Sequence, residues 1–421
     1  MAGGCDRALF EQLVAGTAKR PLTNDEIAAE LERQTLYHPE RDRSGLDELA
    51  ELLRRRFADG DLRLEEEIQE LERAFARQPL VHLYGFALRR EAGSEAAARR
   101  SLIALMEADP GDPMAVVFDA SLRSQTVVSA SEEARMANIA KFATTPLLKN
   151  PYSLAVGVLF EAIREREKAR VLDVGVGSGA QMQALLAVLD RLPHNIGRLE
   201  IVGLDLMPEF LVQAGERIVV AAAALAPKVE VVYQPVEGRI EALDASTIRS
   251  ITGRGLDAAN ATIALHEVAG ESKLAALSHL RRMAPGQLVV AEWNYCLENV
   301  LSQLSTEFVF NVRGVAAAMV AALRERYPIE ESRAVVRDWL SQGAGQLTCP
   351  REQRQECFLD VTTWKALLEH CGFTVLPVDQ HWCEHAAEPG HNSVADEGWY
   401  LMTSDYGGAT PIALLVASPS C

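Results

Sequence analysis

The stretch VLDVGVGSGAQ, residues 171–181, decides the fold class of this 421-residue chain. Apolar residues lead into three glycines at alternate positions, Gly175, Gly177 and Gly179, and a helical pattern follows at once. Glycine adopts left-handed backbone conformations without strain and lets a ligand approach the main chain closely. The pattern therefore predicts a turn between a buried strand and a helix, with a ligand at the positive end of the helix.

Short apolar runs alternate with helical patterns downstream of this turn. Five of them are RVLDV (170–174), LEIVGLD (199–205), VEVVYQP (229–235), LDAANATIAL (256–265) and QLVVAEW (287–293). Strands joined by helices need crossover connections, which predict an α/β fold with a parallel sheet. With FTVLPVD (373–379) and TPIALLVASP (410–419), the sequence predicts a Rossmann-like, mostly parallel seven-stranded sheet with helices on both faces. WYLMTS (399–404) before the last run predicts an antiparallel terminal hairpin.

Helical patterns without strands occupy the chain before this region. Thr23 and Glu26 form a capping box at the start of an apolar-periodic run. We expect an all-α N-terminal domain over residues 1–150 and a Rossmann-like domain over 151–421, which carries a helical insertion at about 295–350 after the fifth strand. Both helical segments are expected to close over the ligand edge of the sheet as a lid.

Charge and composition exclude several classes of partner. The net charge is −17, and no basic run offsets it, so binding to nucleic acid or to anionic membranes is not expected. The N-terminus has no signal-peptide pattern and no apolar stretch of 18 residues is evident, which favours a cytoplasmic protein. Seven scattered cysteines without CxxC pairs indicate reduced thiols. The sequence leaves the oligomeric state open.

The acids around the glycines indicate which ligand the turn receives. Asp173 lies two residues before Gly175, where its charge repels a pyrophosphate and attracts an ammonium group. The glycines also lack the GxGxxG spacing of dinucleotide sites and the GKS or GKT of a P-loop. A cationic amino-acid group is therefore the better partner for Asp173.

The ends of the second and third strands complete this ligand. Asp205, followed by Leu206, lies where an acid accepts hydrogen bonds from both ribose hydroxyls. Val236 and Glu237, at the end of the third strand, lie where they meet an adenine edge. Ammonium, ribose and adenine together predict S-adenosylmethionine as the cofactor. Close packing of a strand and a helix is the alternative explanation of the glycines.

Over residues 170–420 the chain resembles the class I S-adenosylmethionine-dependent methyltransferases, through DVGVGSG, LDLM, QPVEGRIEAL and DAANATIALHEV. A narrower resemblance is to the GRAS-domain family, whose plant members are regulators and whose bacterial members look like Rossmann-fold methyltransferases. Three segments carry it: NPYSLAVGVLFEAI (150–163), REQRQECFLDVTTWKALLEHCGF (351–373) and EGWYLMTSDYGGATPIALLVASP (397–419). The chain keeps three glycines that the plant pattern lacks, which favours the bacterial, enzymatic type.

Several polar and aromatic residues are candidates for chemistry at the carboxyl ends of the strands. His266 follows the fourth strand as a possible general base, with helix capping as the alternative. At the end of the fifth strand, Glu292 and Trp293 are candidate substrate contacts, and Asn294 and Tyr295 are candidate catalytic residues; core packing is the alternative for Trp293.

Further candidates lie outside the strand ends. The resemblance places Tyr152 over the methionyl end of the cofactor, where it can bind the cofactor or assist catalysis. Arg351 and Arg354 are candidates for a substrate carboxylate or for a solvated ion-pair face. HWCEH, with His381, Cys383 and His385, has metal-ligating residue types but lies in a loop-like context, so no metal is predicted.

These residues lead to three hypotheses of function. The first is an S-adenosylmethionine-dependent enzyme, most readily a methyltransferase, that acts on a small-molecule substrate. The second is a lyase, cyclase or aminocarboxypropyl transferase that releases methylthioadenosine from the same pocket. The third is a non-catalytic GRAS-like regulatory or scaffold protein that binds its partners through the helical domain.

Overall fold

The computed structural model describes most of the chain between residues 22 and 420. The described residues are 9, 12, 22–38, 42–59, 65–122, 138, 141, 146–293, 306–348, 357, 359, 361–376, 391–396, 399–404 and 412–420.

The N-terminal region is helical throughout its described residues, as the sequence predicts. Its elements are α2 (Asn24–Gln34), η1 (Thr35–Tyr37), α3 (Leu46–Asp59), α4 (Glu65–Ala74), α5 (Pro79–Glu91), α6 (Glu95–Ala108) and α7 (Pro113–Leu122). The capping box is confirmed, because the Glu26 N–H donates to Thr23 Oγ1 (3.3 Å) and the Thr23 N–H donates to Glu26 Oε2 (2.7 Å). It fixes the start of α2.

The sheet region begins with α9 and alternates strands and helices. Its elements are α9 (Pro146–Ile163), β1 (Lys168–Val174), α10 (Ala180–Arg191), β2 (Arg198–Asp205), α11 (Pro208–Ala222), β3 (Glu230–Glu237), η2 (Ile240–Ala242), α12 (Ala245–Thr252), β4 (Ala258–Thr262), η3 (Leu265–Glu267), α13 (Ser272–Met283), β5 (Gln287–Trp293), α16 (Val361–His370), β6 (Phe373–Leu376), β7 (His391–Asp396), β8 (Trp399–Ser404) and β9 (Ile412–Pro419). Helices α9, α10 and α11 pack on one face of the sheet, and α12, α13 and α16 pack on the other.

The sheet is mixed, which corrects the predicted mostly parallel sheet of seven strands. In the described part of the chain it has nine strands in the order β3-β2-β1-β4-β5-β9-β8-β7, with β6 also paired to β9. The first five strands are parallel to one another, as predicted. Every pairing that involves one of the last four strands, β6, β7, β8 or β9, is antiparallel. The two additional strands are β8 and β7, which extend the sheet beyond β9. The predicted antiparallel pairing of the last two strands is confirmed.

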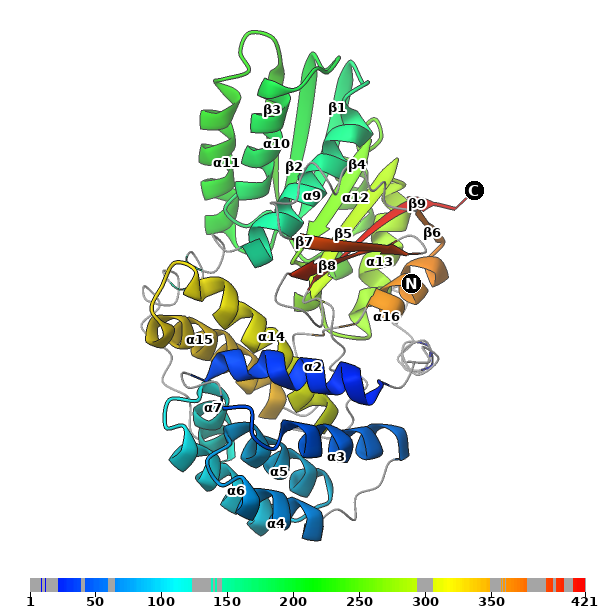
Figure 1. Cartoon of the computed structure of the whole chain (residues 1–421). Helices are drawn as coiled ribbons and strands as arrows, with labels where there is room; N and C mark the ends of the chain where they lie inside the picture. Colours follow the sequence, from blue (N-terminus) through cyan, green and yellow to red (C-terminus); the bar gives the residue numbers. More distant parts are fainter. Residues whose placement is uncertain are drawn as a thin grey trace.

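The helices after β5 share a core with the N-terminal helices. They are α14 (Thr306–Arg324) and α15 (Ile329–Thr348). Their apolar side chains join those of α2, α3, α5, α6 and α7 in one cluster, which we call the helical cluster. We call the elements from α2 to α7, together with α14 and α15, the helical part, and the elements from α9 to β5 and from α16 to β9 the sheet part. Figure 1 shows the two parts stacked end to end, with α14 in contact with α2 on one side and α9 on the other.

Helix α14 has a composition that the sequence analysis missed. By length and apolar content it is the one helix among the described residues that is able to cross a membrane. However, 89% of its apolar window is buried inside the protein. Burial in the helical cluster therefore explains the apolar sequence of α14.

Candidate functional site

The glycine turn, residues 175–179, follows β1 and leads into α10. All three glycines have left-handed backbone angles, with φ of +68° at Gly175, +49° at Gly177 and +76° at Gly179. A Cβ at Gly175 would lie 2.6 Å from the Cβ of Ala264, and one at Gly179 would lie 2.8 Å from the Cα of Ala214. Packing alone therefore excludes side chains at two positions, while a Cβ at Gly177 would make only an ordinary contact, 3.9 Å from the carbonyl oxygen of Gly175.

Asp205 holds the glycine turn from the end of β2. Its Oδ2 accepts the Gly177 N–H (2.9 Å), and its Oδ1 accepts the Met207 N–H (2.9 Å). The Gly175 N–H donates to the carbonyl of Leu204 (2.8 Å). The structure thus brings Asp205 to the turn, as predicted, and gives its carboxylate a structural role there.

Asp173 lies at the centre of a buried polar network behind the turn. The Asn260 side chain donates to Asp173 Oδ1 (2.6 Å) and to Gln181 Oε1 (3.0 Å), and Thr262 Oγ1 donates to Asn260 Oδ1 (2.8 Å). Burial raises the pKa of Asp173 to about 7, and the Asp205 carboxylate adds to this, although the hydrogen bond from Asn260 opposes it. The acid changes charge near neutral pH.

The sequence analysis did not single out Gln181, Asn260 or Thr262. Gln181 lies in the first turn of α10, and Asn260 and Thr262 alternate along β4. A polar pair spaced by two within a buried strand is the signal that was available, because buried amides and hydroxyls need partners.

The end of β3 lies beside the end of β2. In the parallel register Asp205 pairs with Glu237, and Leu204 pairs with Val236. Glu237 is exposed, Val236 is partly buried, and Leu206 is 47% exposed. The predicted ribose and adenine residues therefore share one edge of the sheet with the glycine turn.

His266 and Glu292 form a buried ion pair at the ends of β4 and β5. The imidazole Nδ1 lies 3.1 Å from Glu292 Oε2, and Nε2 lies 3.5 Å from Glu267 Oε1. Burial disfavours the charged ring, but the carboxylates of Glu292 and Glu267 outweigh it and raise the pKa of His266 to about 10. A raised pKa favours the imidazolium at neutral pH, so the general-base role of His266 stays a prediction that this charge state disfavours.

Glu292 is held inside the protein and not toward a substrate. It is fully buried, and its Oε1 accepts the backbone N–H groups of Ala264 (2.8 Å), Leu265 and His266 (3.3 Å). The contact of Glu292 with a substrate therefore stays a prediction, while in this structure its carboxylate holds the backbone after β4. A carboxylate that satisfies three amides and one imidazolium stabilises the loop after β4.

The other predicted site residues are placed only in part. Tyr152 lies in α9 and Trp293 at the end of β5, but their side chains are not among those the structure describes. The remaining candidates lie outside the described residues: Asn294, Tyr295, Arg351, Arg354, His381, Cys383 and His385.

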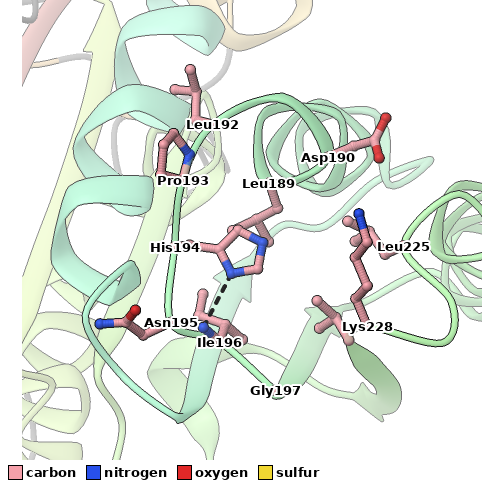
Figure 2. A pocket seen from close by; sticks show the side chains of 11 residues that line it. Leu189, Asp190, Leu192, Pro193, His194, Asn195, Ile196, Gly197, Leu225 and Lys228 are labelled. Carbon is pink, nitrogen blue, oxygen red and sulfur yellow. Dashed lines mark hydrogen bonds between the residues drawn. The ribbon is translucent and has the colours of Figure 1, made fainter.

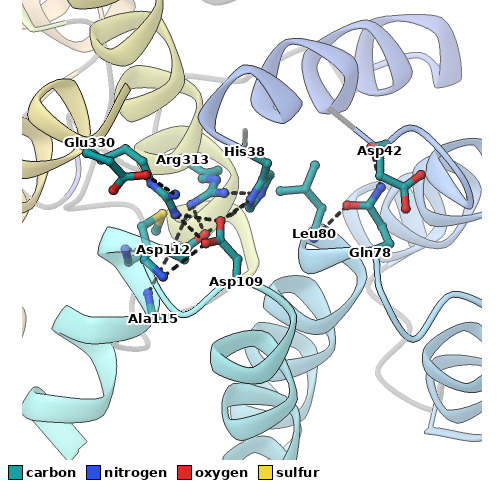
Figure 3. A network of polar contacts seen from close by, with 12 residues as sticks. His38, Asp42, Gln78, Leu80, Asp109, Asp112, Ala115, Arg313 and Glu330 are labelled. Atoms are coloured by element: carbon teal, nitrogen blue, oxygen red, sulfur yellow. Dashed lines mark hydrogen bonds and ion pairs between the residues drawn. The ribbon is translucent and has the colours of Figure 1, made fainter. Parts of the chain in front are cut away.

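A second buried polar cluster lies in the helical part (Figure 3). His38, Asp109 and Asp112 place ligand atoms within 4.8 Å of one another, as in a metal site. However, Arg313 lies 2.8 Å from Asp112, and Arg333 lies 2.7 Å from Asp109. The two guanidinium groups balance both carboxylates, so the cluster is a closed ion network that joins α14 and α15 to the N-terminal helices.

A cavity of about 430 Å³ lies at the amino ends of β2 and β3, away from the glycine turn. Figure 2 shows the His194 ring directed toward its middle, with Lys228 on the opposite wall. His194 Nδ1 accepts the Ile196 N–H (3.1 Å), which fixes the ring. None of the predicted site residues lines this cavity.

A family model described as the GRAS domain family matches residues 101–407, which extend across both the helical and the sheet parts. The chain belongs to the GRAS domain family. Scarecrow-like protein 23 of Arabidopsis thaliana is 27% identical to this GRAS chain over 149 residues, which make up 35% of this chain and 36% of that protein. The match thus spans about a third of the length of that relative.

One solved structure, that of SCL7, supports the fold of this GRAS protein. The crystal structure of SCL7 from Oryza sativa superposes with a TM-score of 0.61 at 17% identity, and the match covers 76% of this chain and 93% of that one. A magnesium protoporphyrin IX methyltransferase from Synechocystis, solved with bound SAH, gives a TM-score of 0.33 at 12% identity, over 64% of this chain and 81% of that one.

The comparisons correct the predicted function. The family model places the chain in the GRAS domain family, the Scarecrow-like relative is similar to it over 149 residues, and the SCL7 structure shares its fold. The prediction of a small-molecule methyltransferase is therefore wrong, and the findings agree with the third hypothesis, a non-catalytic GRAS regulatory protein. The three retained glycines were weak grounds for preferring an enzyme, because packing requires two of them.

Proposed function

We propose that this GRAS protein is a non-catalytic regulatory or scaffold protein, whose helical part binds protein partners and whose glycine turn holds S-adenosylmethionine as a ligand that is not consumed. One observation carries the proposal: the ionisable pair His266 and Glu292, at the ends of β4 and β5, is occupied in holding the protein together. An imidazolium with a pKa of about 10 does not accept a proton from a substrate near neutral pH.

The ligand part of the proposal depends on charge at the glycine turn. Asp173 provides a buried carboxylate that ionises near pH 7, and Asp205 provides a second carboxylate at the same edge. A carboxylate ion has about four acceptor positions, so Asp205 retains acceptors for ribose hydroxyls beside its two backbone partners. The start of α10 adds a positive dipole end, which suits the carboxylate of the methionyl group.

Calorimetry on the full chain tests whether the ligand binds. We expect S-adenosylmethionine to bind at pH 7.5, and Asp173→Asn to weaken binding by about tenfold or more, because one ammonium–carboxylate attraction is lost. Asp190→Asn is the matched control, since Asp190 is an exposed acid on α10. Absence of binding to the folded wild-type protein rejects the ligand part of the proposal.

A second measurement tests whether the ligand is consumed. The protein is incubated with S-adenosylmethionine and then assayed by liquid chromatography for S-adenosylhomocysteine and methylthioadenosine. We expect neither product above the level of a protein-free sample. Formation of either product by the wild type, abolished in a glycine-turn variant that remains folded, contradicts a non-catalytic role.

A further inference from the structure

The loop that follows β4 contains a strained residue. Ile263 has φ of +51°, and among the described residues only Ala284 is another non-glycine residue with positive φ. A β-branched side chain in this region is disfavoured by its own backbone, so the conformation persists only where the surroundings impose it. We call residues 263–266 the coupling loop, and its strained conformation indicates that the surrounding residues impose its position.

The coupling loop is fixed from two sides by buried polar groups. The Ile263 N–H donates to the carbonyl of Ala291 (2.7 Å), and the next three N–H groups donate to Glu292. Lys273, which is 1% exposed, donates to the carbonyls of Leu265 and Val268 (2.7 Å for the latter). These contacts impose the left-handed backbone on Ile263 and hold the loop in one position.

Two adjacent residues of the coupling loop face different parts of the protein. The side chain of Ala264 lies against the glycine turn, at the place where a Cβ on Gly175 would come within 2.6 Å. The side chain of Ile263 packs against the helical cluster. A displacement of the glycine turn therefore reaches the helical part through one peptide unit.

We propose that the coupling loop transmits occupancy of the glycine turn to the helical part, so that a bound nucleoside ligand alters the stability of α14 and of the helices packed around it. The inference rests on the proposed function, because it gives the unconsumed ligand a regulatory effect. A strained residue between two packed bodies suits this role, because its release in a second arrangement offsets part of the cost of moving the loop. By thermodynamic reciprocity, a change in the helical part alters the free energy of ligand binding at the glycine turn by the same amount.

A pair of glycine variants tests the coupling without any ligand. Gly175→Ala and Gly177→Ala place the same methyl group on left-handed backbone, but only the first meets Ala264, since the nearest atom at Gly177 is a carbonyl 3.9 Å away. We expect Gly175→Ala to speed amide hydrogen exchange in α14 by about tenfold, and Gly177→Ala to leave it near the wild-type rate. Gly175→Ala combined with Ala264→Gly removes the clash and restores slow exchange in α14.

The ligand provides an independent arm. S-adenosylmethionine is expected to change exchange in α14 of the wild type and to have little effect on α14 in Ile263→Ala. Equal effects of the two glycine variants on α14, or failure of Ala264→Gly to restore slow exchange, overturns the coupling. If the ligand does not bind to the wild type, the ligand part of the proposed function fails, and the glycine pair still decides whether the loop connects the two parts.

Discussion

Replacement of Asp173 by asparagine is expected to stabilise the protein at neutral and alkaline pH. The carboxyl group is 2% exposed, and its hydrogen-bonding partner is an amide, Asn260, and not a cation. Burial raises its pKa to about 7 from an ordinary value of 3.8. Asparagine has the same shape, keeps an oxygen that accepts the Asn260 amide, and removes the buried charge.

The size of the effect follows from the two pKa values. A difference of about three units, at about 1.4 kcal/mol for each, corresponds to about 4 kcal/mol. Because the folded-state pKa lies above the unfolded one, the free energy of unfolding of the wild type falls by this amount as the pH rises from 3.8 to 7. Above pH 7 the fall is complete. The free energy of unfolding of the variant does not fall in this way, because asparagine does not ionise.

Urea unfolding of both proteins between pH 5 and pH 8 measures the difference. We expect the advantage of Asp173→Asn in the free energy of unfolding to grow by about 3 kcal/mol over this range. Asp190→Asn makes the same chemical change on the exposed surface of α10, and no such growth is expected for it. An advantage of Asp173→Asn that does not depend on pH, or a loss of stability at pH 8, refutes the argument.

Three further predictions follow from the buried charges. NMR of the histidine rings should show that His266 remains an imidazolium up to about pH 9. The stability that the charged ring contributes should be lost as the pH rises from 6.5 through about 10. Titration of His266 near pH 6.5 would contradict the buried ion pair with Glu292. Arg313→Met leaves Asp112 buried without its partner and should lower the free energy of unfolding by about 3–5 kcal/mol in urea, while EDTA leaves the wild-type melting temperature unchanged; a shift with EDTA indicates a bound metal. The affinity for S-adenosylmethionine should fall by about tenfold per pH unit below pH 7 in calorimetry, because Asp173 must ionise; a flat profile excludes Asp173 as the ammonium partner.

The parallel strands were predictable because each is a short apolar run between helical patterns. The strand β7 was not, since HNSVAD (391–396) has little apolar character and its pairing depends on the hairpin with β8. Pairing with a neighbouring strand supplies hydrogen bonds that the apolar pattern of the strand itself does not predict. For the same reason the sequence predicted a mostly parallel sheet, since the direction in which the last strands pair is not visible in their own residues.

The partners of the buried charges were harder to predict than the charges themselves. Arg313 interrupts an apolar helix, which signals a buried cation in need of an acid. Its acid, Asp112, belongs to DPGDP (109–113), which reads as a helix breaker and gives no sign of distant contacts. Likewise, His266 at a strand end resembles a general base until the structure brings Glu292 within 3.1 Å.

The glycine turn shows why a motif identified the fold more securely than the chemistry. Gly175 and Gly179 are required by contacts with Ala264 and Ala214, so packing in this chain accounts for both glycines with or without a ligand. At Gly177 a Cβ would contact only the carbonyl oxygen of Gly175, at 3.9 Å, and no clash forbids it. Since its left-handed φ of +49° is also accessible to asparagine or aspartate at modest cost, packing does not explain glycine there. Evidence for a ligand therefore has to come from Gly177 and from the Asp205 carboxylate, which accepts the Gly177 N–H. The presence of three glycines in the turn is not by itself such evidence.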